Sequence, residues 1–350
     1  MGFKKGNVSF SRFKVEGGPS ALSADDFDKM IKARAFRDFF PEEETEIMGW
    51  TSIDNVLDTE FAYTFNTDDR YRFFALRIDR RMIPASIVKM RVMEEEARIL
   101  KENGQRRLYK EERKAIYEGV RRDLEKSIPP VPRIYEVAWS VEKRTVYFGS
   151  LSYLVCVNFA SLFRETFGLS LITANPVKYI EPGKQLMNPP TMSEFLTWLW
   201  FKAEKGTTSP TDLQVSIVRR VILESGAGEY VENVICQGRH AELREGKEAL
   251  RQGKKVVEAR ISLCRDACEF EFTLRANGFQ FQTVKLPAPE VETEEGELGI
   301  EGQLLERIFL IEKAVDSMEL LEAMFMERRW SDEWPDEVKE MERWANDERS

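Results

Sequence analysis

Residues 84–132 read PASIVKMRVMEEEARILKENGQRRLYKEERKAIYEGVRRDLEKSIPPVP, a charged run of residues that favour helices. From Lys89 to Arg133 the chain holds thirteen Lys and Arg against nine Asp and Glu, although its overall formal net charge is −9. Strand-like aromatic sequence lies on both sides of this run. The pattern predicts a helical arm that projects from a β-rich body.

Helix signals divide this arm into two parts. Pro84 suits the first turn of a helix, and Asn103-Gly104 is a stop signal. We therefore expect a first helix that ends near Glu102 and a second over Lys110–Lys126. A hairpin of two helices buries little by itself, so its apolar side chains must face each other, the body or a partner chain.

The acidity of the chain is concentrated near its C-terminal end. Residues 289–350 hold 20 acidic and 7 basic residues, which leaves 45 basic and 41 acidic residues in 1–288. Charge attracts partners through its distribution over the surface. The balance therefore argues against a protein coated in nucleic acid, but it allows a local basic lining. The plainer interpretation is a solvated, ion-paired surface.

Composition indicates a globular protein. The 350 residues are 42% hydrophobic, enough for a substantial core and about two or three domains. No apolar run approaches the ~20 residues that span a bilayer, and the N-terminus MGFKKGNVSF lacks the apolar stretch of a signal peptide. We expect a soluble cytoplasmic protein, in which the four cysteines are reduced thiols rather than a disulfide framework.

The order of strand and helix patterns predicts an α+β fold. Strand, helix, strand and strand precede the arm, with the last two strands over Glu60–Asn66 and Arg72–Asp79. Strand, strand, helix and strand follow the arm, so we expect a pseudo-repeated central domain that the arm interrupts. Beyond Pro176 a linker and an aromatic amphipathic helix precede residues 211–286, which read mostly as strands.

An apolar stripe from Leu304 to Phe325 has the spacing of one helix face, and we expect it to be core or a subunit contact. With this helix the chain ends in a mixed α+β part. The sequence predicts a central α+β domain over 1–83 and 132–178, which the arm over 84–131 interrupts. A C-terminal base domain follows over 179–325, and an acidic tail over 326–350.

The sequence lacks catalytic signatures. It contains no Walker A, dinucleotide-binding or G-x-S-x-G motif, and a Ser-His-Asp relay would depend on the single histidine, His240. Cys264 and Cys268 have no second pair to complete a zinc site, so we expect no metal and no cofactor. Acidic residues abound, but no spacing singles any of them out, so a two-metal nuclease stays open without support.

Several short motifs stand in order around the helical insert. They are Phe3-Lys4, Ala35-Phe36, Met48-Gly49-Trp50, Arg77 with Arg80-Arg81 before Ile83-Pro84, Pro132-Arg133-Ile134-Tyr135, Trp139, Thr145–Ser150, Phe195-Leu196-Thr197-Trp198 and Gly253-Lys254-Lys255-Val256-Val257. This order and spacing resemble the bacterial recombination-associated protein RdgC family over nearly the full length of the chain.

Members of that family look like DNA-binding proteins that dimerise head to head into a closed ring, with contacts at the helical tips and at the C-terminal base. The resemblance implies that duplex DNA passes through a basic-lined hole, is bound without sequence preference and is shielded from the RecA recombinase. It implies a non-enzymatic, nucleoid-associated homodimer without a membrane partner. Salt-dependent contacts to phosphates suit such binding.

The resemblance also suggests particular residues. Basic side chains at positions that match the family are phosphate-contact candidates, namely Arg77, Arg81, Lys89 and Arg133. Arg80 and Arg239 are further candidates. Tyr135, in P-R-I-Y where the family has P-R-A-F, stands in the place of an aromatic of the tip contact, and a core strand aromatic is the alternative. Gly238-Arg239-His240 departs from the family's basic-polar pair, which leaves the geometry of a DNA contact there open.

Two other functions stay open at this point. A metal-dependent exonuclease, an activity suggested for the family, would degrade linear duplex. A structural or protein-interaction module would retain no DNA. The acidic residues 326–350 add a further hypothesis, in which the tail regulates access to DNA by competing for the basic lining.

Overall fold

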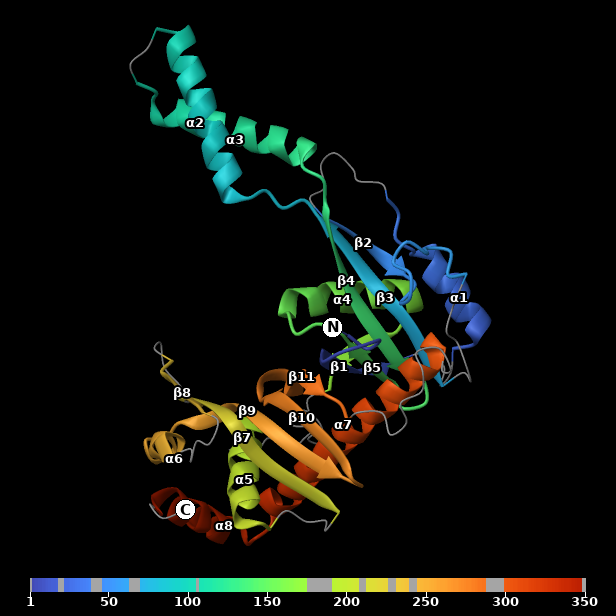
Figure 1. Cartoon of the computed structure of the whole chain (residues 1–350), viewed down its shortest axis with the longest axis vertical. Coiled ribbons are helices and arrows are strands. Elements are labelled where there is room, and N and C mark those ends of the chain that lie inside the picture. The colour runs from blue at the N-terminus through green and yellow to red at the C-terminus, as the bar shows by residue number, and fades with distance from the viewer. Residues whose placement is uncertain are drawn as a thin grey trace. The chain divides into compact units, whose positions relative to one another are not determined.

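The computed structural model describes residues 2–17, 22–38, 46–62, 70–104, 107–174, 191–207, 212–225, 231–238, 244–287 and 299–347. Over these residues the protein is a mixed α+β fold with eight helices and a large antiparallel sheet, labelled in Figure 1. The predicted fold class is confirmed at this level.

The strands are β1 (Val8–Glu16), β2 (Glu46–Thr51), β3 (Tyr71–Arg80), β4 (Val131–Ser140), β5 (Thr145–Phe148), β6 (Ser170–Thr173), β7 (Leu213–Glu224), β8 (Asn233–Gln237), β9 (Lys255–Arg265), β10 (Cys268–Arg275) and β11 (Gln280–Lys285). The helices are α1 (Ala24–Ala33), α2 (Ala85–Glu102), α3 (Lys110–Ser127), α4 (Tyr153–Phe167), α5 (Met192–Lys205), α6 (Arg244–Arg251), α7 (Ile300–Trp330) and α8 (Trp334–Asn346).

The two helices of the arm are confirmed, but the described part of one predicted strand is not a strand. α2 ends at Glu102, where Asn103 is the C-cap and Gly104 has a φ of +63°. Among the described residues the strand before β3 is β2, whereas Glu60–Ala62 is not extended. The rest of the predicted run Glu60–Asn66 lies outside the described residues. Phe61 has a φ of +53°, which interrupts an extended chain.

Contacts divide the chain into two compact units. The first comprises Met1–Ser23, Phe65–Phe73 and Glu136–Ser350, and the second comprises Ala24–Thr64 and Phe74–Tyr135. β3 and β4 contribute residues to both units. The division into central domain, arm, base domain and tail stays a prediction.

In the first unit, β1 joins parts of the chain that are far apart in sequence. Its first half pairs with β11, through Val8↔Val284 and Phe10↔Phe281, and its second half pairs with β5 and β6. The strand order is β4-β5-β1-β11-β10-β9-β7-β8. The Phe10 and Phe281 rings stack with their centroids 5.2 Å apart, so this junction is part of the hydrophobic core.

The apolar stripe of α7 belongs to the core of the first unit. Its seven predicted positions, from Leu304 to Phe325, are each at most 1% exposed. Phe325 packs against Phe195 and Trp198 of α5, and α5 lies against β7 and β9. The choice between core and subunit contact is therefore settled in favour of core for these residues.

The predicted acidic tail contains a packed helix. Trp344 of α8 is 4% exposed and makes edge contacts with Trp200 and Phe201 of α5. Glu337 accepts a hydrogen bond of 3.0 Å from the Trp198 indole. Deleting residues 326–350 would remove these contacts together with the charge, so the tail hypothesis is better tested by neutralising the exposed Glu340 and Glu342.

One carboxylate on α7 gives the stability of the protein a pH dependence. Burial, and then the neighbouring Glu319 carboxylate, raise the pKa of Glu322 to about 7, and Arg12 acts in the opposite direction. Between about pH 4.5 and pH 7 the folded chain therefore holds a proton that the unfolded chain has lost. Stability contributed by the protonated group is present at low pH and is lost as the pH rises through this window.

We expect Glu322→Gln to remove this loss, worth at most about 3 kcal/mol at alkaline pH. Urea unfolding of both proteins at about pH 5 and pH 8 measures the difference, because the variant lacks the titrating group. Glu327→Gln, an exposed position on the same helix, is the matched control. An unchanged pH dependence of unfolding in Glu322→Gln would contradict the assignment.

The second unit packs α1 against β2 and β3 (Figure 1). Phe27 of α1 and Trp50 of β2 both make edge contacts with Phe74 of β3. Gly49 is required here by space, since a Cβ at this position would lie 2.4 Å from the Phe36 Cα atom. The motif Met48-Gly49-Trp50 is thus a strand that allows the segment after α1 to approach closely.

Candidate nucleic-acid interface

The foot of the arm surrounds a hollow of about 490 Å³ that lies within the second unit. It forms where β3 ends, α2 begins and the C-terminal half of α3 passes. Four basic residues line it, namely Arg80, Arg81, Lys89 and Arg121. Among the described residues of the lining, Glu125 is the only acidic one. The lining therefore carries a net positive charge.

Local sequence explains how the hollow forms. Arg80 is the last residue of β3, and Pro84 then starts α2, so Lys89 follows within about one helical turn. On α3, Tyr117, Arg121 and Glu125 are spaced four residues apart and share one face. Contact between α2 and α3 brings that face beside the strand end.

Three of the four cations of the hollow are available for exchange. Arg80 lies 3.7 Å from Glu46 with 56% of its side chain exposed, and Arg121 lies 3.0 Å from Glu125 with 58% exposed. Lys89 is exposed and forms no ion pair with the residues that the structure describes. Exposed ion pairs contribute about 0–1 kcal/mol, so a phosphate can replace these carboxylates at little cost.

Much of the remaining arm surface is ion-paired, as the plainer interpretation of its charge predicted. The pairs are Arg91–Glu94, Arg98–Glu95, Arg98–Glu102, Arg113–Glu96 and Lys114–Glu118. The positive excess that distinguishes the segment is therefore most accessible at the foot of the arm.

Arg77 is held differently from the other candidates. Its guanidinium donates two hydrogen bonds to Asp79, of 2.8 and 2.7 Å, and lies 4.0 Å from the centroid of the Phe36 ring. The hydrogen bond with Asp79 is the main cause that raises the pKa of Arg77. Its side chain is 15% exposed, so Arg77 orients the strand end from within the unit. A phosphate contact by Arg77 stays a prediction.

Comparison with known proteins identifies the family. A family model described as "Putative exonuclease, RdgC" matches residues 7–285 of the 350. The chain belongs to the RdgC family. No curated protein matches the chain. The match includes the arm, the hollow at its foot and the strands β1 to β11, so each RdgC motif quoted from residue 35 onward falls inside it.

The other residues suggested by the RdgC resemblance lie outside the hollow. Arg133 is exposed at the start of β4, with Nη2 3.6 Å from the Met82 sulfur. Tyr135 is half-buried on the same strand, where the chain returns from the arm. Arg239 and His240 fall outside the described residues. The structure thus brings together Arg80, Arg81 and Lys89 from the predicted set.

Sequence reasoning missed Arg121. The signal was present in part, because the spacing of Tyr117, Arg121 and Glu125 marks one face of a predicted helix. That face could be assigned to the hollow only once the packing of α3 against α2 was known.

In the described part of the chain, no group of three or more His, Cys, Asp or Glu side chains is placed to hold a metal ion. None of the described helices is both long and apolar enough to span a bilayer. Cys264 and Cys268 flank a β9–β10 hairpin turn and, like Cys156 and Cys236, are free thiols.

Proposed function

We propose that this RdgC family member binds double-stranded DNA without sequence preference, as a non-enzymatic, ring-shaped homodimer that limits access of the RecA recombinase to DNA. The observation that carries the proposal is the hollow at the foot of the arm, where four basic residues face one acidic residue. Family membership supports it. In a cell such a protein would be associated with the nucleoid.

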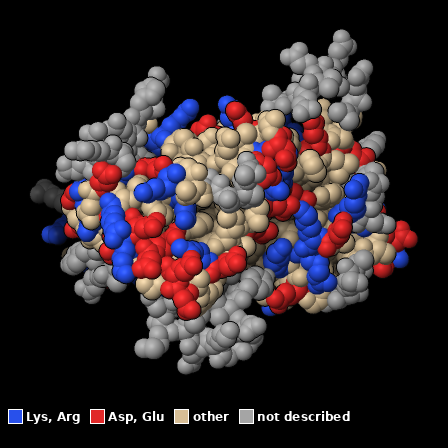
Figure 2. Space-filling view, turned by 90° about the horizontal axis from the view of Figure 1, so that it is seen from below, with Lys and Arg blue, Asp and Glu red and all other residues tan. Residues whose placement is uncertain are grey.

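The surface charge elsewhere suits binding by local contacts. On the face shown in Figure 2, Lys and Arg are intermixed with Asp and Glu, so that face presents no large area of one sign. Lys and Arg that contact phosphates release counterions from DNA, which gives affinity that depends on salt and ignores base identity. A few placed cations can therefore bind DNA on a chain of net charge −9.

Retention of a random-sequence DNA duplex by the purified protein at about 50 and about 200 mM salt tests the proposal. The mass of the protein in solution is recorded alongside. Strong binding by a dimer that collapses at the higher salt is the expected result. A monomer that retains no duplex would overturn the proposal, and magnesium-dependent digestion of linear duplex would favour the exonuclease instead.

Ring closure is the part of the proposal that concerns Tyr135. The arm exposes several large apolar side chains, including Met93 at 61% and Tyr109 at 73%, which supports a contact between arms of two copies. We propose that Tyr135 contributes to this contact in place of the family's phenylalanine.

Tyr135→Ala is expected to loosen ring closure more than folding, since it removes an aromatic contact while leaving the backbone of β4 unchanged. Sedimentation velocity should show a smaller dimer fraction than in the wild type. Tyr135→Phe keeps the ring and serves as the control. A stable dimer with normal DNA retention in Tyr135→Ala would show that Tyr135 is a strand residue without a role in assembly.

A further inference from the structure

One face of the sheet in the first unit carries a group of paired arginines. Strand residues alternate between two faces, and on β10 the side chains of Phe270, Phe272 and Leu274 are buried. The opposite face of β7, β9 and β10 carries four arginines and two glutamates that pair with one another, and the exposed Glu269 of β10 lies on the same face. The paired residues are Arg219 and Arg220 of β7, Glu258 and Arg260 of β9, and Glu271 and Arg275 of β10.

Each glutamate in this group is shared by two guanidiniums. Glu258 lies 3.3 Å from Arg220 and 3.1 Å from Arg275. Glu271 lies 3.0 Å from Arg260 and 3.7 Å from Arg219. A guanidinium has five N–H donors, so the two carboxylates do not use all the donors of the four arginines. The four arginines and two glutamates together also carry a net positive charge.

A distortion of β7 places two of these arginines side by side. Ile217 pairs with Ile261 and Val221 pairs with Ala259, so β7 has more residues than β9 over the same span. Arg219 sits in this bulge with a φ of +61°, a conformation that residues with a Cβ seldom adopt. In a regular strand Arg219 and Arg220 would point to opposite faces. The bulge lets both reach glutamates of the same face.

Three of these arginines are accessible. The Arg219 side chain is 65% exposed, and those of Arg220 and Arg275 are each 39% exposed. Arg260 is only 17% exposed and also donates hydrogen bonds to the Thr273 and Thr283 hydroxyls. Neighbouring strands lie about 4.8 Å apart and β9 lies between β7 and β10, so the three accessible guanidiniums span roughly 10 Å. Duplex DNA carries one charge per about 1.7 Å of its axis, so a surface of this width faces several phosphates.

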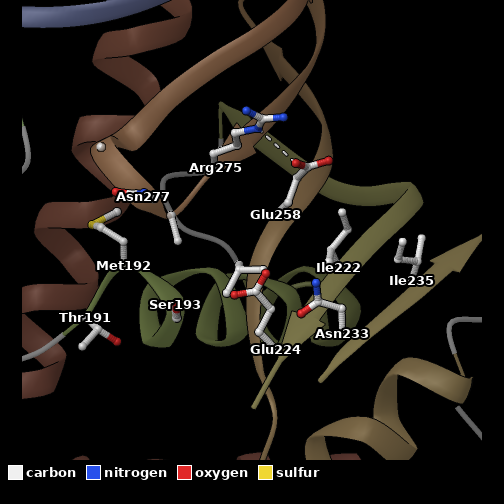
Figure 3. A pocket seen from close by; sticks show the side chains of 13 residues that line it. Thr191, Met192, Ser193, Ile222, Glu224, Asn233, Ile235, Glu258, Arg275 and Asn277 are labelled. Atoms are coloured by element: carbon white, nitrogen blue, oxygen red, sulfur yellow. Dashed lines mark hydrogen bonds and ion pairs between the residues drawn. The ribbon is translucent and has the colours of Figure 1, made fainter. Parts of the chain in front are cut away.

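The adjoining hollow is less suited to a small anion. It has a volume of about 640 Å³ and lies beside Arg275, whose ion pair with Glu258 is drawn in Figure 3. Glu224 and Glu258 both line it, against Arg275 as the one cation among the described lining residues. Two carboxylates would repel a phosphate inside the hollow, whereas the open sheet face has the opposite balance.

We propose that Arg219, Arg220 and Arg275, here called the arginine cluster, bind phosphates of duplex DNA, and that Glu258 and Glu271 compete with DNA for them. The guanidinium fork matches a phosphate as it matches a carboxylate, so the exchange keeps the geometry. This inference rests on the proposed function. It adds a second contact surface, in the first unit, and a reason for the affinity to be limited.

The test measures retention of a random-sequence duplex by the full-length chain at several salt concentrations. Glu258→Gln with Glu271→Gln is expected to raise affinity about tenfold and to steepen the salt dependence, because the arginines are released to phosphate. Glu269→Gln, an exposed glutamate on β10 without an arginine partner among the described residues, is the matched control. We expect it to change affinity by no more than about twofold.

Arg219→Gln and Arg275→Gln together are expected to weaken binding about tenfold and to lower the salt slope by about 2. Arg219 is mostly exposed, so Arg219→Gln alone still reports on the contact if the glutamate variants fail to fold. If Arg219→Gln alone shows the same salt slope as the wild type, the inference is overturned.

The outcomes separate this inference from the proposed function. If the wild type retains no duplex, the proposed function fails and this inference fails with it. If the wild type binds duplex but Glu258→Gln with Glu271→Gln binds no better than Glu269→Gln, only the arginine cluster is excluded. Variants that alter binding of inorganic tripolyphosphate but not of duplex would identify a small-anion site and also overturn the inference.

Discussion

Simultaneous replacement of Arg80, Lys89 and Arg121 by glutamate is expected to weaken the binding of all duplex sequences alike, by about 100-fold at low salt. The three side chains line the same hollow and are largely exposed, so their replacement leaves the core unchanged. Each lost phosphate contact lowers the slope of log affinity against log salt by about 0.9. The slope should therefore fall by about 2 to 3, as measured by duplex retention over a salt series.

A control must separate placement from net charge. Lys101, Lys110 and Arg122 are exposed cations of the same arm that do not line the hollow, and their replacement by glutamate makes the same change in charge. We expect this control to lose much less affinity. Equal losses in the two triple variants would show that only the total charge of the arm matters. Unchanged binding in the first triple would place the interface elsewhere.

Arg77→Ala is expected to destabilise the protein by about 3 kcal/mol, with little direct effect on the cations of the hollow. The substitution removes both hydrogen bonds to Asp79, whose side chain is 3% exposed, and the stacking on Phe36. A buried carboxylate without its partner is costly. Urea unfolding monitored by tryptophan fluorescence measures the loss, because Trp50 lies in the core of the same unit.

The double variant Arg77→Ala with Asp79→Asn tests the cause. If the pair acts as inferred, the double variant should be more stable than Arg77→Ala, since no buried charge is left unpaired. Additive losses would mean that the packing of Arg77 on Phe36, and not the ion pair, carries its contribution. Either result also bears on function, because weakened DNA binding in an unstable Arg77 variant is no evidence for a phosphate contact.

Stability and binding thus draw on different basic residues of one short segment. Arg77 and Asp79 are consecutive positions on one face of β3, and their ion pair lies within the unit. Arg80 and Lys89 lie just beyond, where the chain leaves the strand and enters α2, and both are exposed. Basic residues only a few positions apart therefore have different roles. A buried one stabilises the fold through an ion pair, and exposed ones are available to bind phosphate.

Local patterns were sufficient for most of the elements and for the family. The bounds of α2 follow from Pro84 and Asn103-Gly104, and β7 to β11 fall within residues 211–286, which were predicted to be mostly strands. Glu60–Ala62 was predicted to begin a strand and does not, because composition does not reveal the positive φ of Phe61 or the pairing of β2 with β3.

Contacts between distant residues decided the rest. The pairing of β1 with β11, the burial of Trp344 against α5 and the place of Arg121 in the hollow each join residues that no short pattern relates. Helices and turns depend on neighbours within a few positions, so the sequence predicts them. Whether an arginine such as Arg77 or Arg219 is buried in an ion pair or exposed depends on the packing of segments far apart in the chain, which only the tertiary structure determines.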